Sequence, residues 1–138
     1  MNTHRTLKDV RLFAIILLVL MGLAACANGY MLMKAPDGRL LGMNVALLQH
    51  SPFTDFFIPG VILFSVLGIG SCVTAVVVAR RVNNEAWYVL LEGAAVLIWI
   101  VVQVAMIRNF HIMQVVIGGM GILMLLAGGV MNRLKAKY

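Results

Sequence analysis

The sequence has very little charge for its length. Only 12% of its 138 residues are Asp, Glu, Lys or Arg, and five residues are acidic, whereas 62% are hydrophobic. A soluble domain of this size needs a mainly polar surface, so this composition, with a mean hydropathy of +0.99, excludes that class. The composition indicates an integral membrane protein.

Cysteines and catalytic motifs are also scarce. Two cysteines, Cys26 and Cys72, are too few for a disulfide framework. We expect Cys26 toward the outer end of the first helix and Cys72 toward the inner end of the second, at different depths and unpaired. The sequence contains no nucleophile elbow, glycine-rich phosphate loop or zinc-protease helix. The protein is therefore expected not to be an enzyme and to carry no cofactor.

What the sequence does have is four long apolar segments, at about 12–33, 56–79, 86–107 and 109–132, of which only the third contains a charged residue, Glu92. Each is long enough to cross a hydrocarbon core about 30 Å thick as a helix. Backbone groups in lipid are satisfied only in helices or closed barrels, and unbroken apolar runs are not typical of barrels. We predict an all-α fold, a single transmembrane domain over 1–138 in the form of an up-down four-helix bundle.

The basic residues predict the orientation. Eight lie before the first segment, between the second and third segments, or after the fourth, namely Arg5, Lys8, Arg11, Arg80, Arg81, Arg133, Lys135 and Lys137. Three lie on the other side, namely Lys34, Arg39 and Arg108. Basic residues are retained on the cytoplasmic side, so both termini are expected there. The net charge of +6 is then a topology signal that also attracts anionic lipid, and no nucleic-acid motif accompanies it.

The N-terminus also fits a second interpretation. A basic stretch, the apolar run 12–21 and Leu23-Ala24-Ala25-Cys26 together are typical of a bacterial lipoprotein signal, in which cleavage precedes a lipidated cysteine. The mature chain would then keep three spans. Apolar character resumes at 30–33, where a lipoprotein would have a polar tether, and this favours an uncleaved first span.

The longest connection, 34–55, is expected outside. Pro36-Asp37-Gly38 predicts a turn, with glycine taking a positive φ. The residues from Leu40 to Gln49 predict a short helix on the outer membrane surface, with a coil packed over the bundle as the alternative. Asp55 near the start of the next helix suits the helix dipole, and Phe53, Phe56 and Phe57 are expected to anchor the outer interface.

A polar stripe on the third segment is the main candidate site. Glu92, Trp99 and Gln103 lie within about 40° of one line on a helix. An ionisable residue within a span is a functional hypothesis by default, so this stripe would bind a polar ligand or relay a proton. In the alternative, Trp99 and Gln103 are interhelical hydrogen-bonding and packing groups, and Glu92 pairs at the inner interface with Arg80, Arg81 or Arg133.

A metal site is not expected. His50, Asp55 and His111 lie on the outer side, and imidazole and carboxylate suit zinc. Their spacing lacks the local pattern of a metal site, so solvated or interfacial side chains are the preferred interpretation.

Motifs spread over most of the chain resemble a group of small bacterial membrane proteins without a known activity. They are Pro36-Asp37-Gly38, Leu41-Gly42-Met43, the S-P-F-x-D-F-x-I-P-G stretch at 51–60, and Trp99 to Gln103. The resemblance implies four helices, a structured outer loop and a bacterial cytoplasmic (inner) membrane. Glu92 lies outside the shared pattern.

Three functions follow as hypotheses. The preferred one is a non-enzymatic bundle that binds a lipid, a small apolar ligand or a membrane-protein partner through Trp99, Gln103, Glu92, Phe53, Asp55 and Phe56. The others are a proton-coupled transporter of small cations that uses Glu92, and an assembly subunit of a larger membrane complex. Glycines in the second and fourth segments lack the spacing of the dimerisation motif, so we expect them to pack within one bundle, and a homodimer is not indicated.

Overall fold

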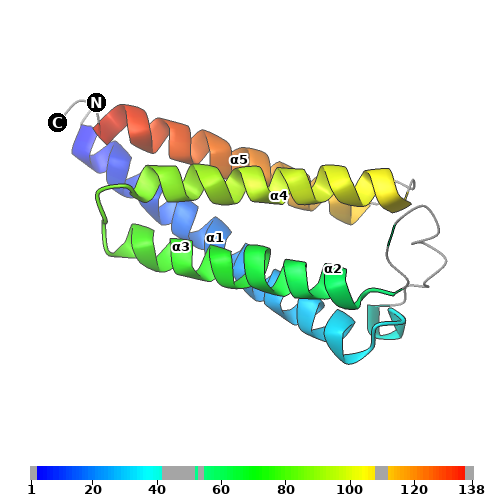
Figure 1. Ribbon diagram of the computed structural model, residues 1–138. Helices are drawn as coiled ribbons and strands as arrows, with labels where there is room; N and C mark the ends of the chain where they lie inside the picture. The colour runs from blue at the N-terminus through cyan, green and yellow to red at the C-terminus, as the bar shows by residue number, and fades with distance from the viewer. Residues whose placement is uncertain (1–2, 42–51, 53–54, 108–111, 136–138) are drawn as a thin grey trace.

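The computed structural model describes residues 3–41, 52, 55–107 and 112–135, and this part of the chain is entirely helical and turn structure, without strands. The elements are α1 (Thr3–Lys34), the 3-10 turn η1 (Arg39–Leu41), α2 (Phe57–Ile62), the π-helix η3 (Leu63–Ile69), α3 (Gly70–Ala79), α4 (Glu85–Ile107) and α5 (Ile112–Lys135) (Figure 1). α2, η3 and α3 follow one another without a break. The described residues thus contain four helical spans long and apolar enough to cross a membrane, which confirms the prediction of a multi-pass membrane protein.

Two helices extend beyond the apolar segments that predict them. α1 begins at Thr3, well before residue 12, because Leu7 is buried and Arg11 bonds to Glu85 of α4. α5 (Ile112–Lys135) continues to Lys135, past the expected end at residue 132. Its last residue is held because Lys135 Nζ donates to the carbonyl oxygen of Asn83 at 2.7 Å. Polar side chains with partners elsewhere in the bundle therefore extend the helices past the apolar limits.

α1 packs antiparallel along α2, η3 and α3, with their backbones in contact. A Cβ atom placed on Gly29 would lie 2.7 Å from the Phe64 nitrogen and 2.8 Å from the Gly60 oxygen. Further along, Gly22 faces Cys72 and Gly68 faces Cys26. Small residues at these positions are what allow helices to approach closely in lipid.

The expectation that the two cysteines sit apart at different depths is wrong. The last turns of α1 pack beside Gly60 near the start of α2, so Cys26 lies opposite Gly68, one turn from Cys72. The Cys26 and Cys72 side chains lie close enough to interact, and both remain free thiols.

α4 and α5 form the second antiparallel pair. Gly121 and Gly128 are seven residues apart and so share one face of α5. Gly121 lies against Val96 and Leu97, and Gly128 lies against Leu90. Gly93 of α4 completes the contact, because a Cβ there would lie 3.1 Å from the Gly121 oxygen. The expected packing of helix-four glycines within one bundle is seen at Gly121 and Gly128, and Gly118 lies in ordinary contact with Ile100, while Gly119 and Gly129 have open space around them.

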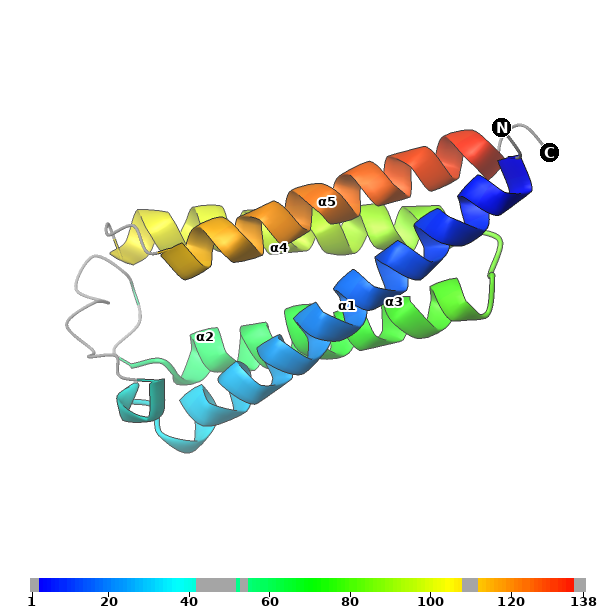
Figure 2. The same cartoon turned by 180° about the vertical axis from the view of Figure 1, so that it is seen from behind.

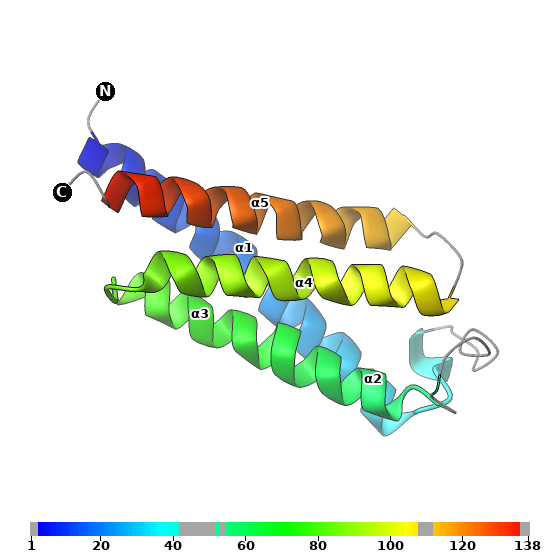
Figure 3. The same cartoon turned by 45° about the horizontal axis from the view of Figure 1, so that its top comes forward.

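The two helix pairs meet at one end of the molecule and diverge toward the other. α1 begins and α5 ends at the same end (Figures 1 and 2), which is called the terminal end here. At the opposite end, the loop end, α2 and α4 lie well apart in all three views (Figure 3). The buried core contains side chains from every span, among them Leu18, Leu67, Val96 and Met124. A cleft lies between α4 and the α2–η3 segment of the diverging pairs.

The predicted turn at Pro36-Asp37-Gly38 is confirmed, since Gly38 has a φ of 82°. The Asp37 carboxylate also accepts a hydrogen bond from the Arg39 backbone N–H at 3.1 Å. The short helix expected over 40–49 falls mostly on residues outside the described part of the chain. Within that part, Leu40 and Leu41 belong to the 3-10 turn η1.

Candidate ligand-binding cleft

A cleft of about 310 Å³ lies between α4 and the α2–η3 segment. It is lined by Pro59, Ile62, Val66, Leu67, Ala95, Ile98, Trp99 and Val102. None of these side chains carries a charge, and the indole N–H of Trp99 is the one polar group among them. Its volume is at the small end of the range for ligand pockets in proteins. Shape and composition suit a slim apolar group.

Each wall of the cleft is one face of a helix. Ala95, Ile98, Trp99 and Val102 follow the i, i+3, i+4, i+7 spacing of a single α-helical face. On the other wall, Val66 and Leu67 belong to η3, where the Gly70 N–H donates to the Ser65 carbonyl five residues earlier. Such wide turns are frequent at functional sites. The π-helix therefore sets the direction in which this wall faces.

The cleft opens sideways, through the face of the bundle that spans the membrane. Its rim residues are exposed, with 64% of Ile98 and 46% of Val66 accessible. Its floor is closed, because Leu67 is 1% exposed and Ala95 and Trp99 pack against the core. A molecule dissolved in the bilayer would reach this cleft directly from the lipid.

The structure separates the three residues of the predicted stripe on α4. Trp99 alone lines the cleft. Gln103 points to α5, where its Oε1 accepts a hydrogen bond from Gln114 Nε2 at 3.4 Å. Glu92 points to α3, where its Oε1 accepts a hydrogen bond from Ser71 Oγ at 3.0 Å. They share one stripe on the helix but meet different neighbours, so they do not form one polar site.

Glu92 occupies a close-fitting buried position. A Cβ on Gly70 would lie 2.9 Å from its Oε2 atom, so the glycine makes room for the carboxyl group. Within the part of the chain that the structure describes, Glu92 forms no salt bridge with Arg80, Arg81 or Arg133. The alternative of an interfacial ion pair through Glu92 is therefore wrong, because its partner is the Ser71 hydroxyl.

The ion pairing at the terminal end is made by Glu85 instead. The Glu85 side chain is fully buried at the first residue of α4, with Arg11 Nε at 2.5 Å and Lys135 Nζ at 3.6 Å from Oε1. Its Oε2 atom is buried without a hydrogen-bond partner. The carboxylate connects α1, α4 and α5. Sequence reasoning missed this cluster, although Glu85 is the one acidic residue in the connection that follows the basic pair Arg80 and Arg81.

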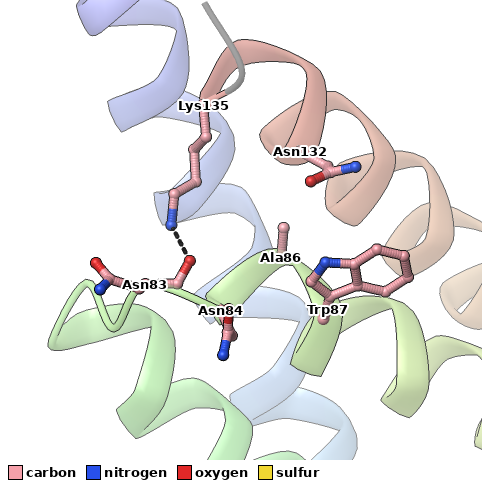
Figure 4. Close-up of a pocket in the computed structure, with 6 residues that line it drawn as sticks. All are labelled: Asn83, Asn84, Ala86, Trp87, Asn132 and Lys135. Atoms are coloured by element: carbon pink, nitrogen blue, oxygen red, sulfur yellow. Dashed lines mark hydrogen bonds between the residues drawn. The ribbon is translucent and has the colours of Figure 1, made fainter. Parts of the chain in front are cut away.

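A second, polar pocket lies beside this cluster. Its volume is about 410 Å³, and its walls are Asn83, Asn84, Ala86, Trp87, Asn132 and Lys135. Figure 4 shows Lys135 extending from α5 to the backbone of Asn83, with Asn132 and Trp87 beside it. Because Lys135 is already bonded to two backbone carbonyls, the pocket offers mainly amide groups next to an exposed indole.

The remaining predicted site residues start α2. The Asp55 carboxylate accepts a hydrogen bond from the Phe57 N–H at 3.0 Å, which satisfies a free donor of the first turn. Phe56 is buried, and its N–H donates to the Pro36 carbonyl at 2.8 Å. Neither residue lines the cleft, and Phe53 lies outside the described residues. Asp55 thus caps the first turn of α2, and Phe56 holds the start of α2 against the turn at Pro36.

No group of three or more His, Cys, Asp and Glu side chains comes together within the described residues. Of the three residues considered for a metal, His50 and His111 lie outside that part of the chain. Asp55 is engaged with the Phe57 N–H.

Of the residues that line the cleft, only Trp99 is among the site residues predicted from the sequence. The residues missed on the other wall, Pro59, Ile62, Val66 and Leu67, belong to a span that is apolar all round. Such a span carries no signal of which face meets a neighbour. Proline early in the span was the one local sign of an irregular helix there.

The comparisons with known proteins give no family for this chain. No protein-family model matches it, and no match was found among curated proteins or among solved structures.

Proposed function

We propose that this protein is a non-enzymatic membrane bundle that binds a lipid acyl chain, or another slim apolar molecule, in the cleft between α4 and α2–η3. The observation that carries the proposal is a cleft with uncharged walls that opens sideways between exposed helix faces. Trp99 would lie against the bound chain. Glu92, Gln103, Asp55 and Phe56 would hold the helices that form the walls.

Selectivity would come from fit. Lipid tails are as apolar as leucine, so the hydrophobic effect gives a ligand little reason to leave the bilayer for the cleft. Packing favours binding instead, because the side chains around an empty cleft lack dispersion contacts that a ligand would supply. A straight or single-kinked chain that fills about 310 Å³ would be preferred over bulkier molecules.

The orientation that we propose places the terminal end in the cytoplasm of a bacterium and the protein in its cytoplasmic membrane as an up-down bundle. The basic side chains described at the terminal end support this, since such residues are retained inside. The segment 34–55 would then lie outside, with a short surface helix beginning near η1. The bacterial source rests on the sequence resemblance.

Trp99 fluorescence tests the ligand site. In a Trp87→Phe background, which leaves one of the two tryptophans, the protein is reconstituted with phospholipids brominated on their acyl chains. Bromine quenches on contact, so strong quenching of Trp99 is expected. Ala95→Phe fills the cleft and should remove most of this quenching.

The matched control is Val101→Phe, which enlarges a side chain of the same helix at a position that is 67% exposed. It should leave the quenching unchanged. Equal quenching with and without Ala95→Phe in the Trp87→Phe background would overturn the proposal. Native mass spectrometry then distinguishes the occupants, because a retained lipid supports the cleft, whereas a co-purifying protein would favour an assembly subunit.

The second candidate is a proton-coupled transporter of small cations. The buried pair of Glu92 and Ser71 within the span favours it, since ionisable residues there mark proton pathways. Against it, Glu92 is a single off-centre carboxylate, and the sequence has no evident inverted repeat of the kind that such transporters usually have. Proteoliposomes with a pH-sensitive dye would decide. Cation-driven proton movement that Glu92→Gln abolishes would establish transport.

A further inference from the structure

The two cysteines of the chain face each other across the contact between α1 and α3. A Cβ on Gly22 would lie 2.6 Å from the Cys72 sulfur, and a Cβ on Gly68 would lie 2.6 Å from the Cys26 sulfur. Each sulfur therefore occupies the space that a side chain at the facing glycine would need. Gly22 and Cys26, like Gly68 and Cys72, are four residues apart, so each pair occupies one face of its helix.

Helix direction brings the two sulfurs together. In an α-helix the Cα–Cβ bond tilts toward the N-terminus. α1 and α3 are antiparallel, so Cys26 leans toward the level of Cys72 and Cys72 leans toward the level of Cys26. Each sulfur lies against the glycine that is one turn from the other cysteine. Two thiols placed at random along four spans would rarely meet in this way.

We propose that Cys26 and Cys72 are a redox-active pair that forms a reversible disulfide when a bilayer-soluble hydroperoxide reaches them. Both residues are partly accessible within spans whose outer faces are apolar, so an oxidant dissolved in lipid reaches them more readily than a polar one. This inference does not depend on the ligand proposed for the cleft.

The chemistry balances in two steps. One thiol attacks the peroxide, which breaks the O–O bond, forms a sulfenic acid and releases an alcohol. The other thiol then attacks that sulfur, forms the S–S bond and releases water. Two electrons pass from the two thiols to the hydroperoxide. The product joins α1 to α3 at the point where Gly22 and Gly68 already hold the backbones together.

Oxidation of the reduced full-length protein in nanodiscs by cumene hydroperoxide tests the proposal. Wild type should lose the mass of two hydrogen atoms, lose both maleimide-reactive thiols together, stay monomeric, and regain its thiols with a reductant. Cys72→Ser should instead gain one oxygen atom at Cys26, which dimedone traps. Addition of two or three oxygens to wild type, or cross-linking between copies, would overturn the proposal.

A relocated thiol is the control for geometry. Cys72→Ser combined with Val73→Cys keeps two thiols but moves one to a position that is 52% exposed, on another side of α3. It should form no intramolecular disulfide under the conditions that fully oxidise wild type. Equally fast closure in this variant would show that general mobility, and not the facing arrangement, brings the cysteines together.

Discussion

At the scale of single residues, the fully buried carboxylate of Glu85 forms ion pairs with Arg11 and Lys135. Arg11→Met removes its closest partner and leaves a fully buried carboxylate with Lys135 alone. Because breaking a buried ion pair leaves a buried charge without its closest partner, the free energy of unfolding should fall by about 3 kcal/mol. Denaturant titration in mixed micelles measures this loss.

Two variants bracket that prediction. Arg5→Met changes an exposed basic residue of the same helix and should have almost no effect. Arg11→Met combined with Glu85→Met replaces the pair by apolar side chains and should recover most of the stability. A double variant no more stable than Arg11→Met would contradict the role given to this pair.

Glu92 gives a second prediction at this scale. Glu92→Gln keeps an oxygen to accept the Ser71 hydrogen bond, so stability should change little. Glu92→Leu leaves the Ser71 hydroxyl without its partner and crowds Gly70, and should lose about 1–3 kcal/mol. Thermal unfolding in nanodiscs compares the two. Similar losses in both variants would show that the carboxyl group itself is required.

At the scale of elements, close helix contact depends on a few glycines. Gly29→Ala would place a methyl group 2.7 Å from the Phe64 backbone nitrogen, where no side chain can move aside. Overpacking of this kind should destabilise α1 against α2 and η3 by about 1–3 kcal/mol. Gly119→Ala is the matched change, since nothing lies within 4 Å of that Cβ, and it should be neutral or slightly stabilising. Thermal unfolding of both variants measures the difference, and equal effects would refute close packing at Gly29.

The sequence predicts the elements much better than it predicts their pairing. Lipid forces apolar segments to be helical, so four spans follow from composition alone. Which faces meet does not follow, because Val66 and Ile98 are as apolar as the buried Leu18 and Val96. For the same reason the partners of Glu92 and Gln103, the approach of Cys26 to Cys72 and the π-helix could not be derived from the sequence.

At the scale of the whole molecule, orientation is the testable property. In a background without native cysteines, single cysteines replace the exposed residues Lys8, Arg133 and Pro52. An impermeant maleimide added to intact bacterial cells should label the Pro52 position only, and it should label the other two after the cells are opened. Labelling of positions 8 and 133 from opposite sides would contradict a shared location for the two ends of the bundle.

The divergence of the two helix pairs has a consequence for the surrounding lipid. With α2 and α4 farther apart at the loop end than the helix pairs are at the terminal end, the protein would form a wedge across a bilayer. It would displace more area from one leaflet than from the other. A protein of this shape is accommodated with less elastic strain where the monolayers are curved, so membrane curvature would influence where it gathers.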